Sequence, residues 1–340
     1  VFMAVINVTP EMDITALIAS DSVNEGDILL LEEGIYFQAV NVSKNYIRII
    51  AKGPGVILYG KGTLSAAFTL SDVTGVAIEG IKIRHYSNNG ILIESGSGNR
   101  IIDNKINNMI SDGIAVVSSS GNIVWKNEIC KCLNGVSLTL DSTSNWVIEN
   151  IAKNCRENGF RTFLGQNNNN AFISNISTGN KSDGFDLFGS NNLLLDNISM
   201  NNAFGILIDE GRDSLAIGNK SRGIKFGPLT IVDGYRNYFA GENHMVCNRR
   251  KGMDILGQFG IFINNEVSYN TDNGMELTSS SAGNLVMDNK LIYNIPKNIV
   301  NEGTDNNIIN NMDKPYEPCE SPMDFCGDCP GEGKEVDLWQ

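Results

Sequence analysis

The sequence predicts an all-β solenoid, in which short parallel strands wind as about ten coils around one core. Asparagine recurs at intervals of 22 to 25 residues over ten successive positions. A glycine follows most of these asparagines by eight or nine residues and opens a short segment in which two apolar residues flank a variable one. Each half-repeat is a β-branched run bounded by Asn, Asp, Gly and Ser. This composition disfavours leucine-rich repeats, which have a similar length.

The N-terminal part of the chain differs from the repeats that follow. Residues 13–20 place apolar side chains on one side of a helical turn, which predicts a short amphipathic helix. Residues 25–36 and 47–60 are apolar runs interrupted by glycine, which predict the first strands.

The glycine of each repeat is expected to form a turn. It follows Asn or Asp in most repeats, as in Asn89-Gly90 and Asp112-Gly113, and this pair favours a left-handed turn without steric cost. The strand that follows alternates, so Ile91 and Ile93 are predicted to point inward and Leu92 outward.

The periodic asparagines are predicted to form a structural ladder. Successive coils lie one strand spacing apart, about 4.8 Å, so side chains one repeat apart can join amide to amide. The ladder residues are Asn104, Asn127, Asn150, Asn175, Asn197, Asn219, Asn243, Asn265, Asn289 and Asn311.

Composition and charge narrow the classes of partner. The chain of 340 residues carries 26 basic and 39 acidic residues, a net charge of −13, which argues against nucleic acid. No apolar run approaches the ~18 residues of a membrane span, so no membrane insertion is expected. No signal peptide is visible, and the expected location is extracellular or on a cell or particle surface.

The repeat pattern resembles the right-handed parallel β-helix of the pectate-lyase-like superfamily, especially NosD-like and mannuronan-epimerase-like repeat proteins. The resemblance implies a single-stranded parallel β-helix with a short N-terminal cap helix. The epimerase-like Tyr-Gly-Phe-Asp-Pro-His signature is echoed only by residues 183–188, where Asp186 is kept while Asp183 and Phe188 replace Tyr and His. The two histidines, His85 and His244, are about seven coils apart and cannot share a site.

The resemblance and the composition divide the chain into three parts. Residues 1–40 are expected to cap the solenoid, residues 41–312 to form the β-helix, and residues 313–340 to form an acidic tail. The last 28 residues hold eight acids and two lysines, a net charge of −6. We expect the tail to be a solvated extension or an end cap, with a docking or cross-linking segment as the alternative.

Chemistry on such a solenoid is expected on outward side chains. The residues two after each repeat glycine are Leu92, Ala115, Ser137, Arg161, Asp186, Leu207, Leu229, Asp254 and Glu276. On the middle coils Arg161, Asp186 and Asp209 are the catalytic candidates, and a surface ion pair between Arg161 and Asp186 is the structural alternative. Substrate-binding candidates are Phe163, Phe188 and Lys225, the last from a local basic group that also contains Lys220, Arg222 and Arg236.

Asp254 and Glu276 fall at equivalent places on neighbouring coils, about 5 Å apart. Such a pair attracts a cation, so it is a candidate metal site, with calcium as the candidate ion and no cofactor required. A pair of catalytic carboxylates and a solvated mismatch are the alternatives.

Seven cysteines are too few for a disulfide-built scaffold. Cys132 and Cys155 each follow their ladder asparagine by five residues, which predicts either a disulfide between adjacent coils or two buried thiols. Cys319, Cys326 and Cys329 in the tail are candidates for cross-linking.

Two functions remain open at this point. The first is a non-catalytic β-helical surface or assembly protein with a glycan-binding or self-associating face. The alternative is a polysaccharide lyase, C5-epimerase or hydrolase that acts on acidic glycans near Asp186. Polysaccharide or a second copy of the chain is the expected partner.

Overall fold

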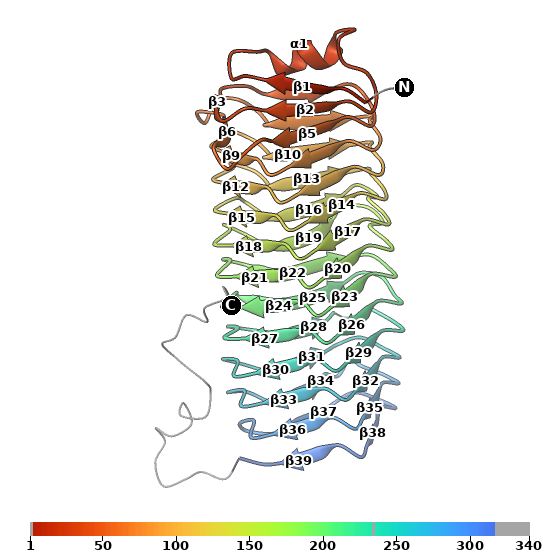
Figure 1. Ribbon diagram of the computed structural model, residues 1–340. Coiled ribbons are helices and arrows are strands. Elements are labelled where there is room, and N and C mark those ends of the chain that lie inside the picture. The colour runs from red at the N-terminus through yellow and green to blue at the C-terminus, as the bar shows by residue number, and fades with distance from the viewer. Residues whose placement is uncertain (1–2, 233–234, 317–340) are drawn as a thin grey trace, which may run out of the picture.

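The computed structural model, which describes residues 3–232 and 235–316, is a right-handed parallel β-helix of about 13 coils (Figure 1). The predicted fold class is confirmed, with more coils than the ten expected. The additional coils lie N-terminal to Asn104, where no regular asparagine spacing marks them. At about 4.8 Å per coil, the stacked strands form a rod of about 60 Å.

Each complete coil contributes one strand to each of three parallel sheets, in the order A, B, C along the chain. Sheet A has 14 strands. They are β1 (Val5–Val8), β2 (Ile28–Leu31), β5 (Arg48–Ala51), β8 (Ala77–Glu79), β11 (Arg100–Ile102), β14 (Ile123–Trp125), β17 (Trp146–Ile148), β20 (Ala171–Ile173), β23 (Leu193–Leu195), β26 (Leu215–Ile217), β29 (Phe239–Gly241), β32 (Ile261–Ile263), β35 (Leu285–Met287) and β38 (Asn307–Ile309).

Sheet B has 13 strands. They are β3 (Gly34–Tyr36), β6 (Val56–Tyr59), β9 (Lys82–Arg84), β12 (Lys105–Asn107), β15 (Glu128–Cys130), β18 (Ile151–Lys153), β21 (Ile176–Thr178), β24 (Ile198–Met200), β27 (Lys220–Arg222), β30 (His244–Val246), β33 (Glu266–Ser268), β36 (Lys290–Ile292) and β39 (Met312–Lys314).

Sheet C has 12 strands. They are β4 (Val40–Val42), β7 (Phe68–Ser71), β10 (Ile91–Glu94), β13 (Ile114–Val117), β16 (Val136–Thr139), β19 (Phe160–Phe163), β22 (Asp183–Phe188), β25 (Phe204–Asp209), β28 (Leu229–Ile231), β31 (Met253–Ile255), β34 (Met275–Leu277) and β37 (Ile299–Asn301).

The N-terminal end of the rod is covered by the predicted helix, α1 (Ile14–Ala19) (Figure 1). Asp13 caps the helix, because its side chain accepts a hydrogen bond from the Ala16 N–H at 2.9 Å. Ile14 and Ile18 are fully buried, so the helix closes the apolar end of the core. Among the described residues, no helix is long and apolar enough to cross a membrane.

The asparagine ladder is confirmed, and it lies inside the turn between sheets A and B. Each ladder asparagine is buried up to Asn289. From Asn127 onward, its side-chain oxygen accepts from both the backbone N–H and the side-chain amide of the asparagine one coil earlier, whereas the Asn104 oxygen accepts from the Ile81 N–H alone. Its own amide also donates to a carbonyl of an earlier coil, as Asn150 does to Val124 at 2.8 Å. All buried polar atoms of such a ladder residue are therefore satisfied.

The glycine turn was predicted wrongly. The left-handed residue lies directly before each ladder asparagine instead, as at Asp103 (φ 52°) and Glu149 (φ 52°). The repeat glycines do not have positive φ; they are required because the coils approach each other closely there. A Cβ atom at Gly135 would lie 2.3 Å from the Gly159 carbonyl oxygen.

Gly135→Ala is therefore expected to destabilise the protein by about 1–3 kcal/mol or more, because the clash is with backbone that cannot rotate away. Urea unfolding measures the change. Gly98→Asn is the matched control: Gly98 has φ +60° and open space for a Cβ, so this change should cost less than ~1 kcal/mol. Equal losses from both substitutions would refute the steric explanation.

The tail prediction falls mostly outside the described residues. The described chain continues through β39, and Cys319, Cys326 and Cys329 lie beyond residue 316.

Candidate functional site

The outward row of sheet C follows the predicted register on the middle coils. Arg161 of β19 pairs with Asp186 of β22, and Asp186 pairs with Leu207 of β25. The next member is Thr230, not Leu229, which is only 1% exposed and belongs to the core. The shift arises because Pro228 delays the start of β28 by one residue relative to the other repeats.

A column of polar side chains leads to Asp186 along the turn between sheets B and C. It consists of the residues that precede the repeat glycines. These are Asn89, Asp112, Asn134, Asn158 and Asp183. Each side-chain oxygen of an asparagine in this column accepts the backbone N–H of the next member, as Asn158 does from Asp183 at 3.0 Å. Phe204 stands opposite Asp183 on the following coil, so the column ends there.

The end of this column and the outward row together form a cluster of Arg161, Asp183 and Asp186, which we call the Arg161 cluster. Asp183 is 7% exposed and Asp186 is 9% exposed, and Asn158 donates to Asp186 Oδ2 at 3.3 Å. Arg161 Nε, Asp183 Oδ1 and Asp186 Oδ1 are buried without a hydrogen-bond partner. Only two other buried side-chain atoms of the described residues lack partners, so unsatisfied polar groups concentrate here.

Burial controls the protonation of the two carboxyls. It raises the pKa of Asp183 to about 6, although Ser182 and Arg161 oppose the shift. It raises the pKa of Asp186 to about 7, with a further contribution from the negative charge of Asp183, while Arg161 acts in the opposite direction. The cluster therefore holds protonatable carboxyls near neutral pH, which is typical of catalytic sites.

These shifts predict a pH dependence of stability. Between the ordinary value of 3.8 and about 7 the folded state binds more protons than the unfolded state, so the free energy of unfolding falls as pH rises. Asp186→Asn should remove part of this slope and be more stable than wild type at pH 8. Urea unfolding at pH 5 and pH 8 tests this, with exposed Asp196→Asn as control. If the free energy of unfolding of Asp186→Asn fell with pH as steeply as that of the wild type, this prediction would be contradicted.

An aromatic pair and a third acid flank the cluster at the C-terminal ends of the strands. The rings of Phe163 and Phe188 meet edge to face with centroids 6.2 Å apart, and the Arg161 guanidinium lies 4.2 Å from the centre of the Phe163 ring. Asp209 pairs with Phe188, two residues beyond the partner of Asp186. The strand geometry places the Cα atoms of Asp186 and Asp209 about 8 Å apart.

Lys225 is not part of this site. It lies in the turn between β27 and β28, where its N–H donates to the Asn202 carbonyl at 3.3 Å. That turn is two coils from β22 and precedes the sheet C strands, whereas Phe163 and Phe188 lie where their strands end.

Asp254 and Glu276 are neighbours, as predicted, but a lysine lies between them. Lys251 Nζ is 3.2 Å from Asp254 Oδ1 and 2.8 Å from Glu276 Oε1. Burial acts to raise the pKa of Glu276, but hydrogen bonds from Lys251 and Asn273 lower it overall. The pair thus has its own cation. No group of three or more His, Cys, Asp or Glu in residues 3–232 and 235–316 is arranged to hold a metal ion.

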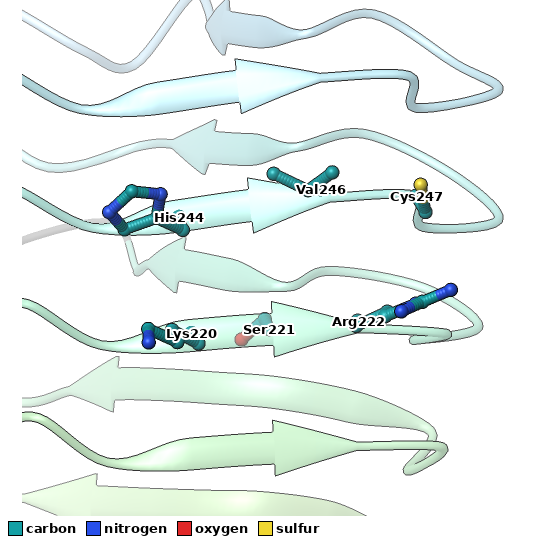
Figure 2. A pocket seen from close by; sticks show the side chains of 6 residues that line it. All are labelled: Lys220, Ser221, Arg222, His244, Val246 and Cys247. Carbon is teal, nitrogen blue, oxygen red and sulfur yellow. The ribbon is translucent and has the colours of Figure 1, made fainter. Parts of the chain in front are cut away.

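A basic pocket of about 290 Å³ lies on sheet B (Figure 2). Lys220 and Arg222 of β27 line it together with His244 and Val246 of β30, and Lys220 pairs in register with His244. His244 Nδ1 lies 3.4 Å from Glu266 Oε2. Arg236 does not join this group, because it pairs with Arg212 at the turn between sheets C and A.

Cys132 and Cys155 are buried free thiols, and Cys130 beside them is also free. Burial raises the pKa of Cys132 to about 12, so the thiol stays protonated at neutral pH and is a poor nucleophile. Cys247 at the basic pocket is disulfide-bonded.

Asp183 was not predicted as a site residue. A signal was present, because the residues before the repeat glycines form a second periodic series of Asn and Asp, which is interrupted after Asp183 and returns only at Asn273. Lys251 was also missed. It lies 25 residues before its partner Glu276, so only the coil geometry brings them together.

Comparisons with known proteins agree on the fold. A family model described as right handed beta helix region matches residues 28–192. No curated protein sequence matches significantly. Among solved structures, the A-module of the mannuronan C-5 epimerase AlgE6 from Azotobacter vinelandii aligns with a TM-score of 0.59 and 11% identity over 90% of this chain and 91% of that chain.

Two glycoside hydrolases are also similar in structure. The GH136 lacto-N-biosidase from Eubacterium ramulus has a TM-score of 0.62 and 12% identity over 90% of this chain and 68% of that chain. The catalytic domain of a GH87 alpha-1,3-glucanase has a TM-score of 0.67 and 13% identity over 91% of this chain and 66% of that chain. Identities this low establish the common fold alone.

Proposed function

We propose that this chain, a right-handed parallel β-helix protein of the pectate-lyase-like kind, hydrolyses a polysaccharide at the Arg161 cluster. The observation that carries the proposal is the concentration of unpaired buried polar atoms on Arg161, Asp183 and Asp186. Buried groups without partners cost free energy, and a bound ligand that hydrogen-bonds to them would recover it.

Asp186 is suited to the role of general acid. Its raised pKa of about 7 keeps much of the carboxyl protonated at neutral pH, so it can donate a proton to the oxygen of a glycosidic bond. Asp183 contributes by its charge, which helps to raise that pKa. Arg161 limits the repulsion between the two carboxyls and can hold a hydroxyl or carboxylate group of the sugar.

Asp209 is suited to the role of general base. Its side chain is more exposed than that of Asp186, and its Cα lies about 8 Å away along the same outward face. Inverting glycosidases separate their two carboxyls by about 6.5–9.5 Å, which leaves room for the attacking water. The Cα spacing is compatible with such a carboxyl separation, and we propose hydrolysis with inversion at the anomeric carbon.

Phe163 and Phe188 supply the binding surface for the sugar. The exposed ring of Phe163 can stack on the apolar face of a pyranose next to the reacting bond. This aromatic pair also favours a second candidate function, in which the chain binds a glycan without turning it over. In that case the pair and Arg161 would form a binding site only.

A panel of neutral and acidic polysaccharides separates the two functions. The purified chain should release reducing ends, and proton NMR of the first product should show the inverted anomer. Unsaturated-product absorbance would indicate a lyase, and exchange of the C5 proton an epimerase; either result would replace hydrolysis. Binding of a glycan with none of these signals would support the non-catalytic function and overturn the enzymatic proposal.

A further inference from the structure

We propose that two copies of this chain pack side by side through the outer face of sheet A. From β14 to β35, none of the 16 outward positions of this sheet is charged or polar: 15 carry apolar side chains and one is Gly241, and all but Ala171 and Gly241 are at least partly exposed. They form what we call the apolar strip. Its residues are Ile123, Trp125, Trp146, Ile148, Ala171, Ile173, Leu193, Leu195, Leu215, Ile217, Phe239, Gly241, Ile261, Ile263, Leu285 and Met287.

The apolar strip is not a requirement of the fold. The outward positions of sheet B over the same coils include Lys153, Lys220 and Glu266. Those of sheet C include Arg161, Asp186 and Asp254. All three sheets alternate in the same way and have the same inner core, so the lack of any charge on one outer face has a separate cause.

The strip faces away from the core of the rod. Trp146 is 47% exposed, Leu215 is 42% exposed and Ile261 is 40% exposed. In Figure 1 these strands form one long wall of the rod, and the helix α1 lies at the N-terminal end rather than on this wall. No described helix or strand packs on it.

The size of the strip fits a protein interface. Eight strands at about 4.8 Å span about 34 Å, and two outward side chains per strand give a width of about 12 Å, or about 400 Å² of flat surface. The largest apolar patch on a monomer is commonly about 300–600 Å² and is often functional, and the strip supplies about half of the roughly 800 Å² that each partner buries in a stable interface. The strip would form the core of such an interface, with the turns on both edges as its polar rim.

A second copy of the chain is the occupant that fits best. A straight apolar strip of this length needs a partner that is equally long, flat and uncharged, and an identical strip meets all three conditions. Two sheets can pack face to face at about 10 Å with their side chains interdigitated. Closed pairs of identical chains are the most common soluble assemblies.

The charges on the rim favour parallel rods. Over the coils of the strip, the edge toward sheet B carries the exposed acids Glu149, Asp196, Glu242 and Asp288 and one base, Lys126, which lies 3.6 Å from Glu149. The edge toward sheet C carries Ser144, Asn169, Asn191, Asp213 and Asn237 at equivalent positions, with Arg212 and Arg236 directly before the last two, so it is less acidic. Antiparallel rods would place the acids opposite each other. Rods related by a twofold axis along their length place the acids opposite the less acidic edge.

Sedimentation and light scattering at tens of micromolar test the proposal. The wild-type chain should have twice its monomer mass of 37.0 kDa. Leu193→Glu should return it to 37.0 kDa. Ile198→Glu is the matched control, because Ile198 is an equally half-buried outward residue on sheet B of the same coil. It should remain a dimer.

Circular dichroism checks that both variants fold, and Leu215→Glu provides a second, more exposed position on the strip. The proposal is overturned if the wild-type chain is monomeric. It is also overturned if the wild-type dimer is dissociated by Ile198→Glu alone, or by neither variant. The orientation has its own test. With parallel rods, two copies of Ile123→Cys should cross-link to each other above the wild-type background, and so should two copies of Leu285→Cys. With antiparallel rods, cross-linking should appear only when the two variants are mixed.

Discussion

Asp186→Asn is expected to lower the turnover of a cleaved polysaccharide by about 10²–10⁴-fold, the usual contribution of a general acid. Asparagine keeps the size of the side chain and can still meet Asn158, but it has no proton to donate to the leaving oxygen. The affinity for the same polysaccharide should change little, because Phe163 and Arg161 remain in place. Initial rates and direct binding measured on the same glycan give the two quantities.

The matched control for this prediction is Asp254→Asn. Asp254 occupies the same outward row of sheet C, but Lys251 pairs with it and it lies outside the Arg161 cluster. It should retain wild-type turnover. In the wild-type chain, turnover should also fall as pH rises above about 7, where Asp186 loses its proton. Undiminished turnover by Asp186→Asn would show that another group supplies the proton.

Asn150→Ala should produce the largest loss of stability, on the order of 3–6 kcal/mol. Asn150 is fully buried, and its oxygen accepts from Asn127 N at 2.9 Å and from Asn127 Nδ2 at 3.0 Å. Its amide donates to the Val124 carbonyl at 2.8 Å and to Asn175 Oδ1 at 3.1 Å. Alanine removes these four hydrogen bonds, each worth about 0.5–1.5 kcal/mol, and leaves the buried Asn127 N–H without its acceptor, whereas Asn127 Nδ2 keeps the Ile101 carbonyl and Asn175 Oδ1 keeps the Asn150 N–H.

The urea midpoint measures this loss, and hydrogen exchange locates it. Amides of β14, β18 and β21 should lose protection before those of the end coils. Asn88→Ala is the control, because Asn88 is exposed and lies outside the ladder. A midpoint that falls as little in Asn150→Ala as in Asn88→Ala would mean that the ladder does not determine stability.

The ladder and the register of the outward row were predictable because both follow the chain period directly. Asn150 and Asn175 stack because the intervals change by only two or three residues from coil to coil. The coils before Asn104 were undercounted because Ile81, which is not an asparagine, holds the equivalent place. Its backbone N–H still donates to Asn104 Oδ1 at 3.0 Å.

Other features depend on distances that the sequence does not express. A glycine after asparagine indicates either a left-handed turn or a close approach between two backbone segments. The distance of 2.3 Å from a Cβ placed on Gly135 to the Gly159 carbonyl oxygen shows that the close approach is the reason here. The ion pairs of Asp254 and Glu276 require Lys251 to bridge its own coil and the next one. The pKa of Asp186 is raised by burial, which cannot be predicted without knowing which residues surround its side chain.

The ladder also has a consequence for how such chains vary in length. Every rung from Asn127 to Asn289 makes the same set of contacts with the rung before and the rung after. If one whole winding were deleted between equivalent residues, the asparagines on either side would form the same contacts as any two neighbours. Deletion of only a few residues would instead shift every later asparagine out of register. Gene duplication or deletion can thus shorten or extend the rod in unit steps while the reacting groups on other windings keep their geometry.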